Sequence, residues 1–308
     1  MTAALFPERS SGAATLRQRL AEPGVLIAPG CFDALTARLL EAAGHEAIFC
    51  GGFSVAASRL GLPDVGLLSY GEMVDQVRTT AAATSLPVIA DMDTGYGNPI
   101  NAQRSLLGFQ QAGAACVMIE DQRWPKRCGH TSGKQVVDRP EAVSRVRACV
   151  EIRDRHGLDI LIMARTDAAA GEGFDEALRR VDDFAAAGAD LTFLEAPESE
   201  SQMARNCAEV AGHKVANMVE DGLTPWLSPA ELTEIGYSVV LYPVSLLLHG
   251  ARAMRRAAEQ LRLGASDGDR AQFDEVRSLV GWPAYEDESA RFGDEATSPG
   301  PKESDHKS

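Results

Sequence analysis

A cysteine lies among cationic residues in the stretch Trp-Pro-Lys-Arg-Cys-Gly-His at 124–130, which is too polar for a protein core. Lys126 and Arg127 precede Cys128, and His130 follows it. Positive charges near a thiol favour the thiolate and lower the pKa of the thiol. No oxyanion-hole or triad pattern surrounds this cysteine, so the stretch favours a thiol that gives a proton to a carbanion. We therefore expect Cys128, Lys126, Arg127 and His130 to be catalytic residues, with the alternative for His130 that it only orders its loop.

Carboxylates cluster at the ends of two apolar runs. Asp91 and Asp93 end one run, and Glu120 and Asp121 end another. The spacing of Asp91 and Asp93 puts both carboxylates on the same side of an extended segment. Hard oxygen ligands without an accompanying histidine suit Mg²⁺ or Mn²⁺ better than zinc or iron. Taken singly, each carboxylate is a solvated loop residue or a helix cap; together they predict a metal site.

An arginine and two further polar residues end other apolar runs. Arg165 follows the run at 160–164, and its planar guanidinium suits a substrate carboxylate. The alternative is an ion pair of Arg165 with Asp167 or Glu195. Glu195 ends the run at 191–195, and Asn217 lies at the end of the run at 214–218.

Eight short apolar runs recur along the chain, and segments of helical period separate them. The runs are 25–28, 47–50, 87–91, 115–120, 160–164, 191–195, 214–218 and 238–242. Eight strand–helix units predict an α/β fold, a (β/α)8 TIM barrel with its chemistry at the carboxyl ends of the strands. A doubly wound open sheet is the alternative, but the glycine fingerprint of a dinucleotide site is absent.

The repeat stops near residue 263. We expect a catalytic barrel domain over 1–263 and a helical extension over 264–292, with one helix at 270–280. The polar segment 293–308, rich in Ser, Lys and Asp, predicts a disordered tail.

Composition narrows the classes of partner. The formal net charge of −14 argues against nucleic acid, which is bound mainly through Lys and Arg. No apolar run approaches the ~20 residues of a membrane span, so we expect no membrane partner. Six cysteines without a Cys-x-x-Cys pair indicate a reduced, cytoplasmic protein rather than a zinc knuckle.

Six motifs together resemble the isocitrate lyase / phosphoenolpyruvate mutase superfamily over most of the chain. The motifs are Gly-Leu-Pro-Asp at 61–64, Asp-Met-Asp-Thr-Gly-Tyr-Gly at 91–97, Glu-Asp-Gln at 120–122, Lys-Arg-Cys-Gly-His at 126–130, Ala-Arg-Thr-Asp at 164–167 and Ala-Asn-Met at 216–218. The resemblance implies a Mg²⁺-dependent barrel that acts on small di- or tricarboxylates. It also implies a homodimer or homotetramer whose last helix is swapped between subunits.

The resemblance also implies roles for individual residues. Asp91 is similar to the direct metal ligand, and Asp64, Asp93 and Glu120 are similar to the shell that holds the metal through water. The positions similar to substrate-binding residues are Gly51, Gly52, Phe53, Arg165, Glu195, Asn217 and Pro243. Residues 122–135 resemble a lid that closes over the substrate and brings in Cys128.

Departures from the family pattern bear on the substrate. Cys128 is typical of the carbon–carbon lyase branch, which cleaves 2-alkylmalates or 2-methylisocitrate to an α-keto acid such as pyruvate plus a carboxylate. By this resemblance, Leu248 occupies the position at which methylisocitrate lyases carry an arginine. Phe49 occupies the position at which they carry a tyrosine that is proposed as the base. Pro243 fits lyases better than oxaloacetate hydrolases. Carboxyphosphonoenolpyruvate mutase, oxaloacetate hydrolase and a non-catalytic binding barrel are the alternatives.

Overall fold

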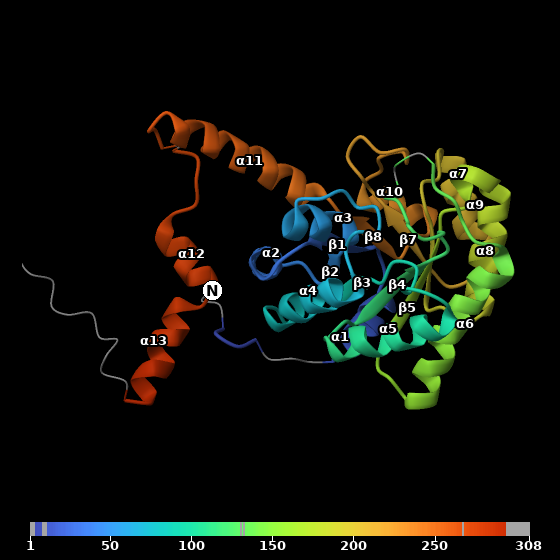
Figure 1. Cartoon of the computed structure of the whole chain (residues 1–308), viewed down its shortest axis with the longest axis horizontal. Coiled ribbons are helices and arrows are strands. Elements are labelled where there is room, and N and C mark those ends of the chain that lie inside the picture. Colours follow the sequence, from blue (N-terminus) through green and yellow to red (C-terminus); the bar gives the residue numbers. More distant parts are fainter. Residues whose placement is uncertain (1–3, 8–10, 130, 132, 267, 294–308) are drawn as a thin grey trace, which may run out of the picture.

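The computed structural model describes residues 4–7, 11–129, 131, 133–266 and 268–293. Eight parallel strands form a closed barrel in chain order, and β8 pairs with β1 (Figure 1). The strands are β1 (Leu26–Cys31), β2 (Ile48–Cys50), β3 (Val88–Asp91), β4 (Cys116–Glu120), β5 (Leu161–Thr166), β6 (Leu191–Leu194), β7 (His213–Asn217) and β8 (Val239–Tyr242). The predicted (β/α)8 barrel is confirmed.

Helices precede, separate and follow the strands, and most of those between strands cover the outside of the barrel (Figure 1). They are α1 (Gly12–Leu20), α2 (Ala34–Ala42), α3 (Gly52–Val55), the π-helix η1 (Ala56–Leu60), α4 (Tyr70–Ala82), α5 (Pro99–Gln111), α6 (Arg139–His156), α7 (Ala169–Glu172), α8 (Phe174–Ala186), α9 (Glu200–Glu209), α10 (Pro229–Ile235), α11 (Ser245–Arg262), α12 (Phe273–Leu279) and α13 (Trp282–Arg291). Ser69 and Ser228 form capping boxes at the starts of α4 and α10, which fixes where these helices begin.

The strands are buried on both faces because alternate side chains join two different clusters. Phe49, Ile89 and Met118 belong to the cluster that fills the barrel, together with residues of α1. Ile48 and Ala90 belong to the layer between the strands and the outer helices. Continuous burial explains why the strands read as unbroken apolar runs rather than as alternating patterns.

The chain leaves its strand sooner after β3 than the sequence suggested. β3 ends at Asp91, and Asp93 has a left-handed backbone with φ of 48°. The expectation that an extended segment puts Asp91 and Asp93 on one side is therefore wrong. A turn after β3, rather than strand periodicity, directs the Asp93 carboxylate toward the mouth, whereas Asp91 is still part of the strand.

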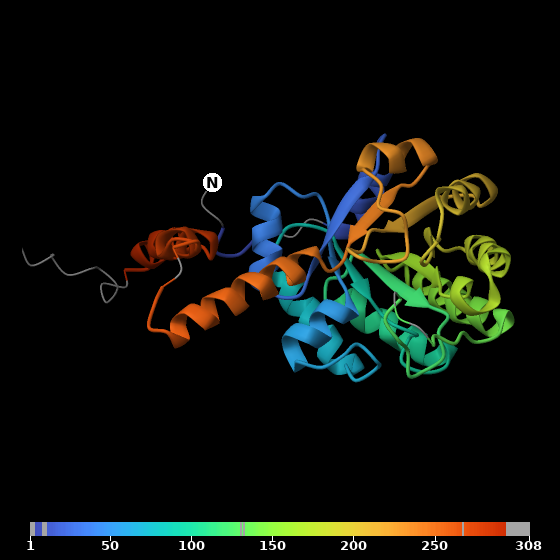
Figure 2. The same cartoon turned by 90° about the horizontal axis from the view of Figure 1, so that it is seen from above.

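The C-terminal helices extend away from the barrel (Figures 1 and 2). No residue of α11 is buried. α12 occupies most of the helix predicted at 270–280 and lies near α2, where Arg38 Nη1 donates to the Leu279 carbonyl at 3.3 Å. The sequence did not predict α13. Of the predicted tail, residues 294–308 lie outside the described part of the chain.

No helix in the described ranges combines the length and the hydropathy that a membrane span requires.

A buried arginine ties the ends of β4 and β5 to the outer helices. Arg180 Nη1 donates to Asp121 Oδ2 at 3.0 Å and to the Val137 carbonyl at 2.8 Å, and Nη2 donates to Glu172 at 2.8 Å. Asp121 Oδ2 also accepts the Thr166 hydroxyl at 2.6 Å. The positions of the segment after β4 and of the end of β5 therefore both depend on the Arg180 guanidinium.

Replacement of Arg180 by Met should lower the free energy of unfolding by about 3 kcal/mol, because it leaves a buried carboxylate without its cation. Chemical denaturation followed by circular dichroism measures this. Arg179→Met is the matched control, since Arg179 is 58% exposed and pairs with Glu176 on the same helix. A loss below about 1 kcal/mol is expected for the control. Equal losses for the two variants would contradict the assignment.

Candidate active site

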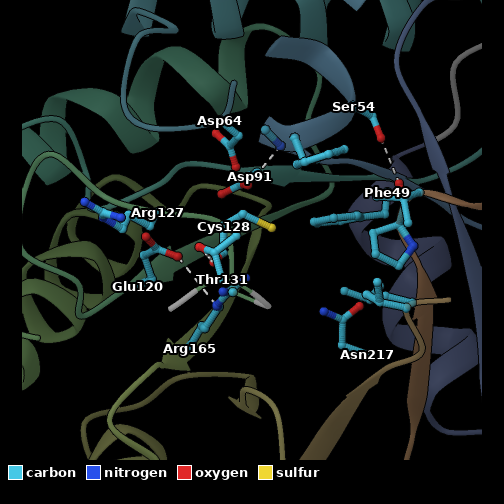
Figure 3. Close-up of a pocket in the computed structure, with 18 of the residues that line it drawn as sticks. Phe49, Ser54, Asp64, Asp91, Glu120, Arg127, Cys128, Thr131, Arg165 and Asn217 are labelled. Carbon is cyan, nitrogen blue, oxygen red and sulfur yellow. Dashed lines mark hydrogen bonds and ion pairs between the residues drawn. The ribbon is translucent and has the colours of Figure 1, made fainter. Parts of the chain in front are cut away.

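A cavity of about 270 Å³ opens at the carboxyl ends of the strands (Figure 3). Most of the sequence-predicted site residues line this cavity: Gly51, Gly52, Phe53, Asp64, Asp91, Glu120, Lys126, Arg127, Cys128, Arg165, Asn217 and Pro243. Asp93 and Glu195 lie directly behind it through ion pairs with Lys126 and Arg165. His130 lies outside the described residues.

The carboxylates of the predicted metal site surround one lysine. Lys126 Nζ lies 2.6 Å from Asp64 Oδ1 and 2.8 Å from Asp93 Oδ1, and all three side chains are buried. Asp91 instead accepts the backbone N–H groups of Gly52 and Asp93, each at 3.0 Å. The structure thus brings together the four predicted carboxylates and adds a cation that sequence reasoning had assigned to catalysis.

This cluster has more negative than positive charge. Burial, together with the charges of Asp91 and Asp64, raises the pKa of Asp93 to about 7 despite Lys126. Burial also raises the pKa of Glu120 well above its ordinary value, and Glu120 Oε1 has no hydrogen-bond partner. A divalent cation would supply the missing positive charge, so these residues fit Mg²⁺.

The carboxylates do not form a ready set of direct metal ligands. Among the described residues, no group of three or more His, Cys, Asp or Glu side chains has the arrangement of direct metal ligands. Mg²⁺ dehydrates reluctantly and usually retains several waters when one or two carboxylates bind it. One direct ligand, with the other carboxylates acting through water, is compatible with this arrangement.

Arg165 forms the ion pairs that were the alternative interpretation of its position in the sequence. Its Nε lies 2.9 Å from Asp167 Oδ2, and its Nη1 lies 3.3 Å from Glu195 Oε2. The guanidinium also borders the cavity and lies over the Phe193 ring. The flanking carboxylates therefore fix the orientation of a cation at the cavity wall, and its binding of a substrate carboxylate stays a prediction.

The predicted lid, residues 122–135, contributes Arg127, Cys128 and Thr131 to the lining of the cavity (Figure 3). The Gln122 side chain donates to the Arg127 carbonyl at 2.8 Å and accepts its N–H at 2.9 Å. The Thr131 hydroxyl donates to the Cys128 carbonyl at 2.7 Å. These contacts fix the backbone on both sides of the thiol, which is partly exposed.

Apolar side chains form a further part of the lining, the apolar wall, which comprises Phe49, Phe53, Val219, Leu241, Pro243, Val244 and Leu248. Phe193 also lines the cavity but lies against Arg165. The Ser54 hydroxyl donates to the Pro243 carbonyl at 2.9 Å and so ties the loop after β2 to the end of β8. The cavity thus has a charged side under the lid and an apolar side near α11.

Sequence reasoning missed two residues that hold the lid. Gln122 belongs to a recognised motif, but nothing in the motif assigns its side chain to the lid backbone. Lys134 resembles an ordinary solvated loop lysine in the sequence, yet its side chain is 2% exposed and pairs with Asp167. Only the folded lid reveals either contact.

Known proteins support the same class of barrel enzyme. The chain belongs to the phosphoenolpyruvate mutase / isocitrate lyase superfamily, since the family described as phosphoenolpyruvate phosphomutase matches residues 16–262. A 2,3-dimethylmalate lyase of Eubacterium barkeri is 42% identical over 79% of this chain and 83% of its own length. The petal death protein of Dianthus caryophyllus is 39% identical over 94% and 93%. A 2-methylisocitrate lyase of Halalkalibacterium halodurans is 37% identical over 80% of each chain.

Solved structures agree with the fold. A 2,3-dimethylmalate lyase superposes with a TM-score of 0.87 at 35% identity, covering 93% of this chain and 97% of the other. An oxaloacetate acetylhydrolase bound to 3,3-difluorooxalacetate gives 0.88 at 32% identity, covering 92% and 97%. A phosphonopyruvate hydrolase in complex with oxalate and Mg²⁺ gives 0.81 at 26% identity, covering 92% and 99%. The predicted family is confirmed.

Gly129 allows the lid to approach Arg165. A Cβ atom at Gly129 would lie 2.3 Å from Arg165 Nη2 and 2.8 Å from the Glu195 carboxyl carbon. Gly129→Ala should therefore displace the lid and lower kcat/KM about 100-fold, while the melting temperature stays within about 2 °C of the parent.

Steady-state kinetics and thermal melting measure these effects of Gly129→Ala. Gly71→Ala is the control, because no atom lies within 4 Å of the corresponding Cβ position. Full activity in Gly129→Ala would show that the lid does not need this contact.

Proposed function

We propose that this chain is a Mg²⁺-dependent carbon–carbon lyase. Its substrate is a 2-hydroxy diacid of the 2-alkylmalate type, which it cleaves to an α-keto acid such as pyruvate plus a carboxylate. The observation that carries the proposal is that Asp91, Arg165 and Cys128 line one cavity. A metal ligand, a carboxylate-binding cation and a proton donor are the groups that such a cleavage needs.

Under this proposal, the residues of the cavity have different roles. Arg165 and Asn217 would bind one substrate carboxylate, and Asp91 would hold Mg²⁺ directly while Asp64, Asp93 and Glu120 act through water. Mg²⁺, when bound, would polarise the 2-oxygen and the adjacent carboxylate of the substrate.

The cleavage itself is a retro-aldol step. The 2-hydroxyl loses its proton to a base, the C2–C3 bond breaks, and its electron pair passes to C3 as an enolate. Cys128 Sγ then gives its proton to C3, which completes the carboxylate product. Phe49 has no basic atom, so the base differs from the tyrosine of methylisocitrate lyases. A lid closed over the mouth would keep water from the enolate.

The apolar wall supports the choice of substrate. Leu248 borders the cavity where a cation would be needed to bind a third carboxylate. A carboxylate desolvated against this wall would lose its hydration without an ionic partner, whereas an alkyl group would pack there favourably. The apolar wall therefore favours 2-alkylmalates over tricarboxylates such as 2-methylisocitrate.

A phosphonomutase reaction is the second candidate, because one relative has the corresponding name. The carboxyvinyl-carboxyphosphonate phosphorylmutase of Arabidopsis thaliana is 38% identical over 88% of this chain. A carboxyphosphonate substrate would carry an extra anionic group, for which the apolar wall offers no cation. Release of an α-keto acid from an alkylmalate distinguishes the lyase from the mutase.

We further propose a homodimer or homotetramer in which the C-terminal helices exchange between subunits. α11 has no buried residue, and Met254, Leu261 and Trp282 expose large apolar side chains on these helices. A partner subunit would bury this surface. We place the protein in the cytoplasm, because all six of its cysteines are free thiols.

Cys128→Ser should reduce the release of pyruvate from 2,3-dimethylmalate at least about 100-fold, since a serine hydroxyl is a far weaker acid than a thiol. A coupled lactate dehydrogenase assay measures pyruvate, and calorimetry checks that oxalate still binds. Cys207→Ser is the control, because Cys207 lies outside the cavity lining. Wild-type turnover by Cys128→Ser would rule out its role as proton donor.

Leu248→Arg should shift the ratio of kcat/KM for 2-methylisocitrate over 2,3-dimethylmalate by about tenfold, because it supplies a cation for the third carboxylate. His249→Arg adds the same charge to the next position of α11, outside the cavity lining, and should leave the ratio unchanged. If both variants shift the ratio equally, the discrimination arises from net charge rather than from the apolar wall.

A further inference from the structure

A second lysine of the lid is buried against the site. Lys134 Nζ lies 2.8 Å from Asp167 Oδ1, and the two side chains are 2% and 0% exposed. The same ammonium donates to the Gly129 carbonyl, one residue beyond Cys128. A buried lysine needs such partners, since burying an unpaired ammonium is costly. The Lys134 side chain therefore joins the middle of the lid and its C-terminal part to Asp167, directly after β5.

Asp167 connects Lys134 to Arg165, the arginine proposed to bind the substrate. Arg165 Nε donates to Asp167 Oδ2 at 2.9 Å, and Nη2 donates to Oδ1 at 3.1 Å. Oδ1 is thus shared between Lys134 of the lid and Arg165 of the barrel. Asp121 Oδ1 accepts the Asp167 N–H at 2.9 Å and holds this carboxylate in place.

The lid backbone at Gly129 is also in direct contact with Arg165. The backbone at Gly129 approaches Arg165 so closely that a Cβ atom would lie 2.3 Å from Nη2. A shift of the Gly129 carbonyl therefore moves the Cys128 backbone relative to Arg165. Lys134 is the one described lid side chain that bonds both to this carbonyl and to the carboxylate behind Arg165.

We propose that Lys134 is a positioning residue that latches the closed lid to Arg165 through Asp167 and so sets Cys128 over the substrate. The latch fixes the position of Cys128 relative to Arg165. Lys126 joins the lid to Asp64 and Asp93, two carboxylates of the predicted metal site. The effect of the latch on turnover rests on the proposed function. The effect of the latch on lid opening does not depend on which reaction the protein catalyses.

Alkylation of Cys128 by iodoacetamide tests the latch without any substrate. In a Cys207→Ser background, Lys134→Met should speed labelling of Cys128 about tenfold, because the lid opens more often. Mass spectrometry of peptides reports each cysteine separately. The buried Cys149 should stay unlabelled, which separates lid opening from global unfolding.

Gln135→Met is the matched control, since it removes a polar side chain from the neighbouring exposed position and should leave the labelling rate unchanged. Lys134→Arg retains the cation and should restore most of the protection. Under the proposed function, Lys134→Met should lower kcat for keto acid release more than it changes KM.

An unchanged labelling rate of Cys128 in Lys134→Met would overturn the latch, as would equal acceleration at Cys149. If labelling follows the prediction but no diacid is cleaved, the latch stands and the proposed lyase activity fails. If diacids are cleaved but labelling is unchanged, the lyase stands without the latch.

Discussion

Four carboxylates buried in one barrel mouth repel one another, and the rest of the site is arranged around that repulsion. Lys126 neutralises part of the charge of Asp64 and Asp93, and Arg165 faces Glu120 at 3.5 Å. Burial and mutual repulsion still raise the pKa of Asp93 to about 7. Such a concentration of charge persists only because the closed barrel fixes the strand ends that carry it. A divalent cation would relieve this repulsion.

The lid completes the site by charge as well as by shape. It contributes two buried lysines, Lys126 toward the metal carboxylates and Lys134 toward Asp167. The thiol of Cys128 lies between them in the chain, and Gly129 lets the backbone pack on Arg165. Under the proposed function, closure of this lid would bring Cys128, the proton donor, next to Arg165, while Lys126 offsets part of the negative charge of Asp64 and Asp93.

The sequence predicted the barrel well because strands buried on both faces leave unbroken apolar runs, and closure requires eight of them. It also identified the residues at the mouth, since polar side chains directly after such runs can only lie at the strand ends. Turn geometry could not be predicted in the same way. Asp93 reaches the site through a left-handed backbone rather than through strand spacing. The partners of Lys126 and Lys134 depend on how the lid folds back, which no local pattern encodes.

The site depends on the binding of a divalent cation to the carboxylate cluster through Asp91. Isothermal titration of Mg²⁺ into chelator-treated protein measures this binding, with Asp91→Asn as the comparison. We expect one saturable Mg²⁺ site per chain that is at least about tenfold weaker in Asp91→Asn. Absence of saturable binding in the parent protein, or equal affinity in Asp91→Asn, would contradict it.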